Sequence, residues 1–530
     1  MSHEITPCLL SIEVATTLQL PSFNIVGLPN PEVAEAKERV RAAIEASGFR
    51  FPRKRVLVNL SPAHLRKHGT GLDLPIALAV LLSSRKTKKR NPTAHPHDRK
   101  IWVAWGELGL DGNVKTAGSI TRAIHSSWQA RSTLVILSHD DFSDAQRAHR
   151  LIRDANCFNW PPPRIVPVGN LAEAWSYLES IMVFGEDQGD CLFPKALGHE
   201  LLHHARSQIP VSSLMPLSPS LARMLGIAAS GRHHLLLLGP RGSGKSHALE
   251  WLVSLQPKIP PDLELTRVLI SEMGGLSSSE SRCPSFSVRR ISAQVRPAAL
   301  IGSVASALIR PGEFSLAHGG LLIADEIPEW SRDSREILRE PMERGQVTLT
   351  RTHGTVELPA RFTLAANGNF CPCGGWPPEL SVNISPDTSG GVTLCRCSHQ
   401  ARSRYLSRIS GALLDRIDLV IQLRGGTAEK KCSPTLEELQ DSVKKAVERS
   451  MAAWGNSPGY LSGGELEQIL SDHPHWQGHP ALKSSDSLRG RHKILRIALS
   501  LASWDGASEP TASHMIEASF YRPEHIGLGG

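Results

Sequence analysis

Gly239-Pro240-Arg241-Gly242-Ser243-Gly244-Lys245-Ser246 matches the pattern G-x-x-x-x-G-K-[ST] without a mismatch. Four leucines, Leu235 to Leu238, run directly into this stretch, and a short apolar run bounded by glycine predicts a buried parallel strand. Residues 247–253, which follow it, can continue as a helix. A strand, a glycine-rich turn and a helix in this order are the context that a phosphate-binding loop requires.

The residue types of this loop suit phosphate binding. Glycines let backbone N–H groups turn toward phosphate oxygens, and the N-terminus of the following helix adds a partial positive charge. Lys245 can reach the β- and γ-phosphate oxygens, and the Ser246 hydroxyl can bind Mg²⁺. The sequence therefore predicts a nucleotide site formed by Gly239, Pro240, Arg241, Gly242, Ser243, Gly244, Lys245 and Ser246.

A second acidic motif follows the phosphate-binding loop in the chain. Leu321-Leu322-Ile323-Ala324 is an apolar run that ends in two carboxylates, Asp325 and Glu326. At the carboxyl end of a strand, Asp325 can hold Mg²⁺ through water, and Glu326 can polarise the water that attacks the γ-phosphate. An apolar strand ending in Asp-Glu is a weak signal alone, but after a complete phosphate-binding loop it indicates a Walker B motif.

Composition limits the class of protein. A chain of 530 residues is too long for one ordinary core, so we expect two to four domains. Its 40% hydrophobic and 21% charged residues are typical of a globular protein. The net charge of +8 permits a polyanionic partner without requiring one. Because no apolar run is long enough to span a membrane and residues 1–4 do not resemble a leader, we expect a cytoplasmic protein with no membrane partner.

Four of the nine cysteines form two C-x-C pairs, Cys371 with Cys373 and Cys395 with Cys397. Proline, glycine and asparagine are common between the pairs, which is typical of a polar loop. Four thiolates that close such a loop can form a structural Zn²⁺ site. The alternative is two pairs of reduced thiols without a metal.

The first 180 residues predict a separate α/β domain. Apolar strands at residues 22–29, 56–60, 101–106 and 134–137 accompany helical patterns at 33–46 and 74–82. A basic stretch at residues 85–100 interrupts this domain, and it is either a solvated loop or an arm that contacts phosphates. Residues 181–215 predict a linker.

Several segments of this domain resemble the Mg-chelatase-like AAA+ family in its YifB/ComM branch. The resemblance rests on residues 23–29, 38–44, 48–52, 58–63, 73–77 and 106–112. It implies a fold related to ribosomal protein S5 domain 2 and to the Lon protease domain. Protease relatives use a serine nucleophile with a lysine base, but this chain has Gly71-Leu72-Asp73-Leu74 where the serine would stand, and residues 118–121 offer no matching lysine. We therefore expect no peptidase activity.

The same resemblance assigns three further residues to catalysis. Residues 362–369 are similar to the strand that ends in sensor 1, with Asn369 the better match and Asn367 the alternative. Residues 413–418 resemble a motif whose arginine, here Arg416, reaches the γ-phosphate of the neighbouring subunit. Arg489 corresponds to sensor 2 and is expected to serve its own subunit. Fixed donors at these positions would meet the charge that develops on the γ-phosphate.

This chain departs from the family pattern at one place, and it has one candidate segment for contact with nucleic acid. Ser292-Ala293 stands where the family has Pro-His-His, so no role of a histidine pair is transferred. Residues 345–358 predict a hairpin, and in related helicases a hairpin here faces the pore. Arg351 and His353 are therefore candidates for contact with a nucleic-acid backbone.

The resemblance covers nearly the whole chain and implies an α/β multidomain architecture. We expect a Lon-like domain at 1–180, a linker at 181–215, an AAA+ core at 216–425 with a candidate zinc loop at 371–397, and a helical lid at 426–530. An arginine that acts on the next subunit implies a ring, which we expect to be a homo-hexamer.

The function that the resemblance implies is an ATPase that uses ATP and Mg²⁺ to move DNA. Helicase or branch-migration activity on single-stranded or branched DNA is the first expectation. Metal insertion as a magnesium-chelatase subunit is an alternative, but the Lon-like domain belongs to the YifB/ComM branch. A third alternative is protein remodelling without a role on DNA.

Overall fold

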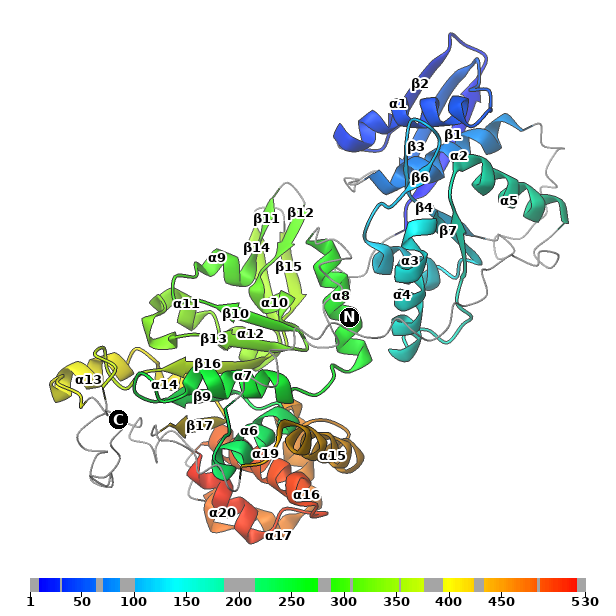
Figure 1. Cartoon of the computed structure of the whole chain (residues 1–530). Coiled ribbons are helices and arrows are strands. Elements are labelled where there is room, and N and C mark those ends of the chain that lie inside the picture. The colour runs from blue at the N-terminus through cyan, green and yellow to red at the C-terminus, as the bar shows by residue number, and fades with distance from the viewer. Residues whose placement is uncertain are drawn as a thin grey trace. The chain divides into compact units, whose positions relative to one another are not determined.

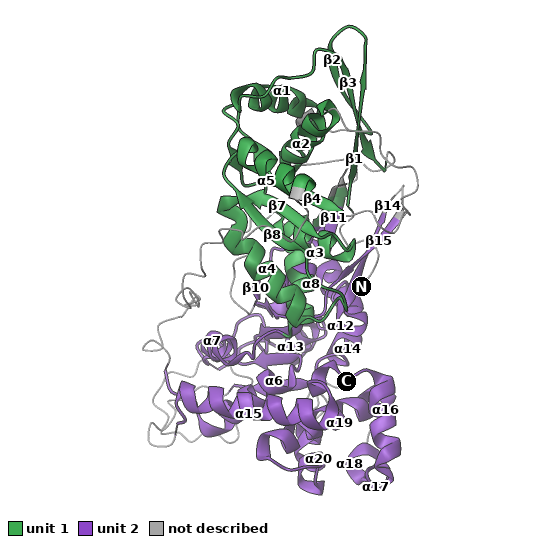
Figure 2. Cartoon of the chain, turned by 90° about the vertical axis from the view of Figure 1, so that its right-hand side faces the viewer, with its two compact units in different colours: residues 1–203, 260–283, 304–310 green, residues 204–259, 284–303, 311–530 purple. Residues whose placement is uncertain are grey.

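The computed structural model describes residues 9–28, 31–62, 70–85, 101–184, 215–274, 287–305, 308–351, 354–375, 394–423, 433–483 and 487–521. Two compact units divide the chain, as Figure 2 shows: unit 1 holds residues 1–203, 260–283 and 304–310, and unit 2 holds residues 204–259, 284–303 and 311–530. Most of the predicted basic stretch, most of the predicted linker and the centre of the cysteine loop lie outside the described residues. Within the described part, no helix has the length and apolar character needed to cross a membrane.

Unit 1 begins with a three-stranded sheet in the order β1-β3-β2. In chain order, its three strands and two helices are β1 (Ser11–Thr17), β2 (Ser22–Val26), α1 (Pro31–Ala46), β3 (Arg55–Ser61) and α2 (Asp73–Ser84). Strand β3 pairs antiparallel with β1 and parallel with β2. Alternate residues of β3 are buried, as a strand with one covered face requires.

A second sheet of unit 1 is parallel, in the order β4-β7-β8. The elements of this part are β4 (Trp102–Trp105), β5 (Glu107–Leu108), β6 (Val114–Lys115), α3 (Ile120–Gln129), β7 (Leu134–Ser138), α4 (Phe142–Asp154), β8 (Arg164–Val168) and α5 (Leu171–Phe184). All five residues of β7 are buried, because a central parallel strand is covered on both faces.

Helix α8 (Pro261–Met273) also packs in unit 1, against α3 and α4. The buried Glu272 carboxylate accepts hydrogen bonds from the backbone N–H groups of Thr121 (3.1 Å) and Arg122 (2.9 Å). These N–H groups belong to the first turn of α3, where a helix has no internal acceptors for them. Glu272 thus caps α3 from a distant part of the chain.

The stretch in which peptidase relatives carry a serine has a structural role here. Gly71 and Leu72 form a 3₁₀ turn, and Asp73 begins α2. The buried Asp73 carboxylate accepts hydrogen bonds from Arg39 Nε (2.7 Å) and Nη2 (3.0 Å). A two-point bond of this kind holds α1 and α2 together, which accounts for the aspartate without a catalytic role.

Unit 2 is organised around a five-stranded parallel sheet in the order β10-β13-β16-β9-β17 (Figure 1). Its strands are β9 (Leu235–Leu238), β10 (Val288–Ile291), β13 (Leu321–Ala324), β16 (Thr363–Gly368) and β17 (Leu419–Gln422). Every residue of β9, β13 and β16 is buried. The predicted strands at 235–238 and 321–324 are confirmed residue for residue.

Shorter elements of the chain connect these strands. They are β11 (Gly302–Ala305), β12 (Leu308–Pro311), the hairpin of β14 (Gln346–Arg351) and β15 (Gly354–Pro359), α9 (Pro297–Ile301), α10 (Glu313–Leu316), α11 (Arg332–Glu336), α12 (Arg339–Arg344), α13 (His399–Leu406) and α14 (Gly411–Leu414). The predicted hairpin is confirmed, but residues 352–353 at its turn and the Arg351 side chain are outside the described part, so its proposed contacts stay predictions.

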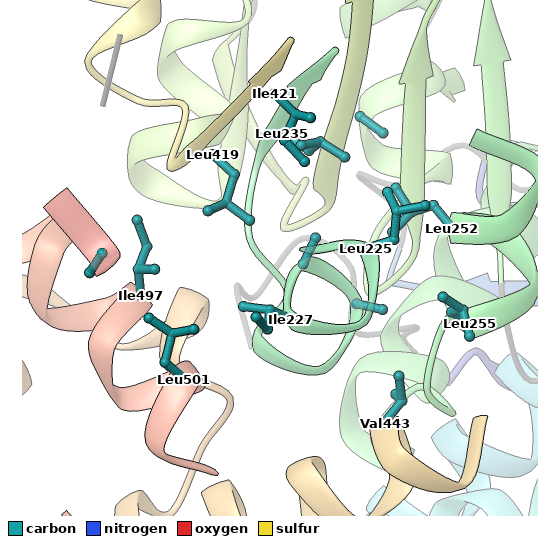
Figure 3. Close-up of a cluster of buried hydrophobic side chains, with 14 of the residues drawn as sticks. Leu225, Ile227, Leu235, Leu252, Leu255, Leu419, Ile421, Val443, Ile497 and Leu501 are labelled. Atoms are coloured by element: carbon teal, nitrogen blue, oxygen red, sulfur yellow. The ribbon is translucent and has the colours of Figure 1, made fainter. Parts of the chain in front are cut away.

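The C-terminal helices share one core with the sheet of unit 2. These helices and the two that flank the phosphate-binding loop are α6 (Pro219–Gly231), α7 (Lys245–Leu255), α15 (Leu436–Trp454), α16 (Gly463–Asp472), α17 (Pro474–Gln477), α18 (Pro480–Lys483), α19 (Leu488–Asp505) and α20 (Ala512–Phe520). Figure 3 shows Leu235 and Leu419 of the sheet with Ile227 of α6 and Ile497 of α19 in this core. Capping boxes at Thr435 and Ser462 explain where α15 and α16 begin.

Candidate functional site

The predicted phosphate-binding loop connects β9 to α7. Gly242 (φ 75°) and Gly244 (φ 87°) have left-handed backbone conformations that favour glycine, and α7 begins at Lys245. The loop therefore places the first-turn N–H groups of α7 and the positive end of the α7 dipole at the carboxyl end of β9. This local geometry is suited to an anion such as a phosphate.

The Lys245 ammonium group lies inside the loop. It donates hydrogen bonds to the carbonyl oxygens of Gly239 (2.8 Å) and Pro240 (2.7 Å) and to Asn369 Oδ1 (3.0 Å). Burial lowers the pKa of Lys245 to about 8, although the nearby Glu326 carboxylate acts in the opposite direction. The Ser243 hydroxyl oxygen is buried and has no hydrogen-bond partner among the described residues. A cation held by neutral acceptors beside an unpaired hydroxyl fits a site that accepts an anion.

We expect nucleotide binding to be accompanied by proton uptake, because of the lowered pKa of Lys245. The charged form of this lysine is lost as the pH rises through about 8, whereas bound phosphate oxygens favour the charged form. Binding at pH 8.5 should then take up roughly 0.8 proton, and affinity should fall as the pH rises further. Calorimetry of ATP binding in two buffers of different ionisation enthalpy measures this uptake. A proton count of zero at pH 8.5 would mean that Lys245 is already charged before ATP binds and that its pKa is not lowered.

Asp325 and Glu326 directly follow β13 at the same edge of the sheet. Glu326 has a left-handed backbone (φ 49°, ψ 49°), which is uncommon for a residue with a side chain and recurs at functional sites. Asn367 Oδ1 accepts the Glu326 N–H (2.8 Å), and Asn367 Nδ2 donates to Asp325 Oδ1 (2.8 Å). One asparagine thus fixes both acidic residues.

Asn367 and Asn369 therefore have different contacts. Asn367 lies in β16 and bonds to the acidic pair, while Asn369 follows the strand and bonds to Lys245. Both amides thus bond to groups at the loop edge of the sheet. The sequence favoured Asn369 for sensor 1. It did not indicate that Asn367 positions Asp325 and Glu326.

The residues predicted to hold Mg²⁺ lie at one edge of the sheet. Ser246 is in the first turn of α7 and exposed, and Asp325 is at the end of β13. Strands β9 and β13 are separated only by β16, which places their ends about 10 Å apart. A hydroxyl and a carboxylate at such a separation fit an Mg²⁺ ion that keeps several of its waters.

Arg416 and Arg489 form a cluster around one carboxylate. Each guanidinium makes an ion pair with a different oxygen of Glu343, at the end of α12. Arg416 also donates to the carbonyl oxygen of Ala412 (2.6 Å), and its side chain is 13% exposed, against 52% for Arg489. The two arginines lower the pKa of Glu343 below its usual value, with the Arg416 hydrogen bond as the largest cause.

The backbone that carries Arg416 lies at the opposite edge of the sheet from the phosphate-binding loop. The N–H of Asp418, two residues after Arg416, donates to the carbonyl oxygen of His234, just before β9, whereas the loop follows the last residue of β9. A four-residue strand separates its two ends by about 10 Å. We expected Arg489 to serve its own subunit; in the structure its guanidinium pairs with Glu343, the carboxylate that Arg416 also contacts, and the role in its own subunit stays a prediction.

The four predicted cysteine ligands come together. The Sγ atoms of Cys371, Cys373, Cys395 and Cys397 all lie within 4.8 Å of one another. Tetrahedral Zn–S bonds of 2.3 Å would place the sulfurs about 3.8 Å apart, so the cluster fits such an ion. Burial raises the pKa of Cys371 above its usual value, whereas its hydrogen bond to Cys373 lowers the pKa of Cys373. The cluster could hold a metal.

The cysteine cluster is directly connected to the phosphate-binding loop. The Arg241 N–H donates to the Gly374 carbonyl oxygen (2.8 Å), between the two cysteine pairs in sequence, and the Gly239 N–H donates to that of Gly368 (3.2 Å). Gly374 has φ 73°, and a Cβ there would meet the Arg241 side chain. The sequence did not indicate this contact, because the partners are far apart along the chain.

The fold and these motifs place the chain among P-loop proteins of the AAA+ type. The family described as "Magnesium chelatase, subunit ChlI" matches residues 218–431, and "Subunit ChlI of Mg-chelatase" matches residues 12–141. The protein YifB of Escherichia coli K12 is 30% identical over 522 residues, covering 97% of this chain and 94% of YifB. Competence protein ComM of Haemophilus influenzae Rd is 30% identical over 528 residues, with 97% and 94% covered. The chain therefore belongs to the Mg-chelatase-like family that includes YifB and ComM.

Proposed function

We propose that the chain is an Mg²⁺-dependent AAA+ ATPase that works as a ring-forming motor on DNA. The observation that carries the ATPase assignment is the pairing of Lys245 with Asn369 beside Asp325, Asn367 and Glu326 at one sheet edge. Lysine, amide and carboxylate groups in this arrangement are the parts that phosphoryl transfer to water requires. Family membership supports the same assignment.

Each residue has a defined role in this proposal. Lys245 and the loop N–H groups bind the β- and γ-phosphates, and Glu326 orients the attacking water and accepts its proton. Asn369 places a polar amide near the γ-phosphate, while Asn367 keeps the acidic pair in position. Ser246 and Asp325 would hold Mg²⁺, which neutralises charge on the phosphates when bound.

We propose that Arg416 and Arg489 act on the nucleotide of a neighbouring copy. The backbone of Arg416 lies at the sheet edge opposite its own phosphate-binding loop, and Arg489 pairs with the same carboxylate, Glu343. A contact in which one edge meets the opposite edge of the next copy is head-to-tail, and head-to-tail contacts form a ring when the rotation between copies closes. A homo-hexamer is the ring that we propose, in the cytoplasm.

DNA is the substrate that we propose for this motor. The name of the relative ComM refers to competence, and the net charge of +8 permits a polyanionic partner. The family descriptions name a magnesium-chelatase subunit, which supports metal insertion as an alternative. Protein remodelling without DNA is the third class.

We also propose that the N-terminal domain is Lon-like without peptidase activity and that residues 426–530 form the ATPase lid.

Strand separation on a forked DNA separates these classes. The purified protein with ATP and Mg²⁺ should release the labelled strand, and the Glu326→Gln variant should bind the fork without releasing it, because this change removes the group that activates water. Replacing ATP by a non-hydrolysable analogue should have the same effect. If wild-type protein that hydrolyses ATP never moves the strand or a branch point, the DNA motor is rejected and the two alternatives stand.

We further propose that Cys371, Cys373, Cys395 and Cys397 hold a structural Zn²⁺ ion. Their sulfurs already lie at distances that suit four Zn–S bonds. Two of the four, Cys371 and Cys395, are buried, where a metal-bound thiolate is protected from solvent. The bond between Gly374 and Arg241 means that a fixed cysteine loop also fixes the phosphate-binding loop.

Protein prepared without chelator should contain one zinc ion per chain by elemental analysis. The Cys395→Ser change should remove that zinc and lower the Tm by about 5 °C, the shift that roughly 2 kcal/mol produces in a domain of this size. ATP affinity should fall as well. Cys157→Ser is the matched control, because Cys157 lies outside the cluster. Wild-type protein without zinc, or a zinc content unchanged in Cys395→Ser, would reject the site.

A further inference from the structure

Unit 1 contains a pocket that the ATPase assignment does not use. It has a volume of about 720 Å³ and lies where the segment between α1 and β3 meets Thr16 of β1 and Ser83 of α2. That segment reads Phe49-Arg50-Phe51-Pro52-Arg53-Lys54, and all six of these residues line the pocket. The volume is within the range of ligand-binding pockets in proteins. Its lining alternates aromatic rings with cations.

The cations of this pocket are available for a ligand. Arg50, Arg53 and Lys54 are exposed, and none has a hydrogen-bond or ion-pair partner among the described residues. The pocket also contains one carboxylate, Glu45, which already bonds to Arg41 (3.4 Å). Three unpaired positive charges around one neutralised carboxylate create a local positive potential, and such a potential attracts anions.

The aromatic rings of the pocket are held by neighbours. Phe51 packs against Phe23 with ring centres 5.2 Å apart, and the Arg41 guanidinium lies 5.6 Å from the Phe51 ring centre. Phe49 meets Trp175 edge to face at 6.1 Å. Both phenylalanines are half-buried, so each keeps part of its surface for a ligand. Rigid aromatic surfaces beside cations are the combination that binds unpaired nucleotides, because bases stack while phosphates meet the charges.

We propose that this pocket of unit 1 binds single-stranded DNA, with phosphates on Arg50, Arg53 and Lys54 and bases against Phe49 and Phe51. The proposal rests on the proposed DNA motor and adds a second place on the chain where its substrate is held. Single strands are favoured over duplex because the bases of a duplex are already stacked and cannot reach the rings. Phosphate contact alone would not distinguish the two forms.

The test compares two double variants of the full-length protein, each of which replaces two cations by glutamate and so changes the net charge by the same amount. Arg53→Glu with Lys54→Glu changes the pocket, whereas Lys115→Glu with Arg150→Glu changes two exposed residues of unit 1 outside it. Binding to a labelled single-stranded oligonucleotide is measured by anisotropy over a salt series. The pocket variant should bind at least about tenfold more weakly, and its salt slope should fall by about 1.4, since each contact to a single strand contributes about 0.7. The control variant should bind like wild type.

A third variant tests stacking without changing charge. Phe51→Leu should weaken single-strand binding several-fold and leave the salt slope unchanged, because leucine has no flat π-surface for a base. Thermal unfolding of all variants checks the fold. Equal loss in both double variants, unchanged binding in the pocket variant, or an equal loss on duplex DNA would overturn the pocket proposal. A wild-type protein that binds no DNA at all would instead reject the DNA motor, so the two failures are distinguishable.

Discussion

Lys245→Ala is expected to abolish ATP hydrolysis, with turnover falling at least about 100-fold, the loss typical of removing one fixed donor to a developing charge. The Lys245 ammonium donates to Gly239 and Pro240 of the loop and to Asn369, which follows β16. A bound phosphate would take the place of these neutral acceptors. Without the lysine, the loop also loses the positive charge that offsets the triphosphate, so ATP affinity should fall together with turnover.

The matched control for this change is Lys444→Ala, which removes an exposed lysine of α15 far along the sequence from the loop. It should hydrolyse ATP like wild type. Phosphate release measures turnover, and circular dichroism confirms that each variant is folded. Turnover by Lys245→Ala close to the wild-type rate would mean that hydrolysis occurs at another site.

Arg416→Ala is expected to stop hydrolysis while leaving ATP binding nearly unchanged. The reason is the position of Arg416 at the sheet edge opposite its own loop, where it pairs with Glu343. An arginine that reaches the γ-phosphate of the next copy contributes to the transition state and little to binding, a contribution of about 10³-fold or more in rate. Arg404→Ala, in the exposed face of α13, is the matched control and should keep its activity.

Mixing two inactive variants tests whether the arginine acts between copies. A Lys245→Ala subunit keeps its arginine, and an Arg416→Ala subunit keeps its loop. An equal mixture should recover roughly a quarter of wild-type turnover, because half of the loops and half of the facing arginines are intact in a ring. Arg489→Ala in place of Arg416→Ala should give the same recovery. No recovery in either mixture, with mixed assemblies shown by mass, would place both arginines in their own subunit's site.

Local sequence predicted the central strands because each is a short apolar run bounded by glycine or charge. Strands β9 and β13 have the predicted ends. Helix α8 shows where local sequence is insufficient. It directly follows the phosphate-binding loop helix in the chain, yet it packs in unit 1, where Glu272 caps α3. That contact joins segments about 150 residues apart, and no local periodicity encodes such a partner.

The candidate site also contains residues that local sequence predicts and residues that it does not predict. The loop and the acidic pair were predicted because their chemistry requires a fixed order of residues within a few positions. Glu343, which pairs with both arginines, and Asn367, which holds Asp325 and Glu326, were not predicted in these roles. Each bonds to residues on other elements, so its role depends on strand order and not on its own sequence neighbours.

ATP turnover measured with and without DNA tests the central claim most directly. The purified wild-type protein with Mg²⁺ should hydrolyse ATP several-fold faster when single-stranded or forked DNA is added. Raising the salt concentration should remove this stimulation, since phosphate contacts weaken steeply with salt. Turnover that stays the same at every DNA concentration and at low salt would contradict the assignment of this ATPase as a DNA motor.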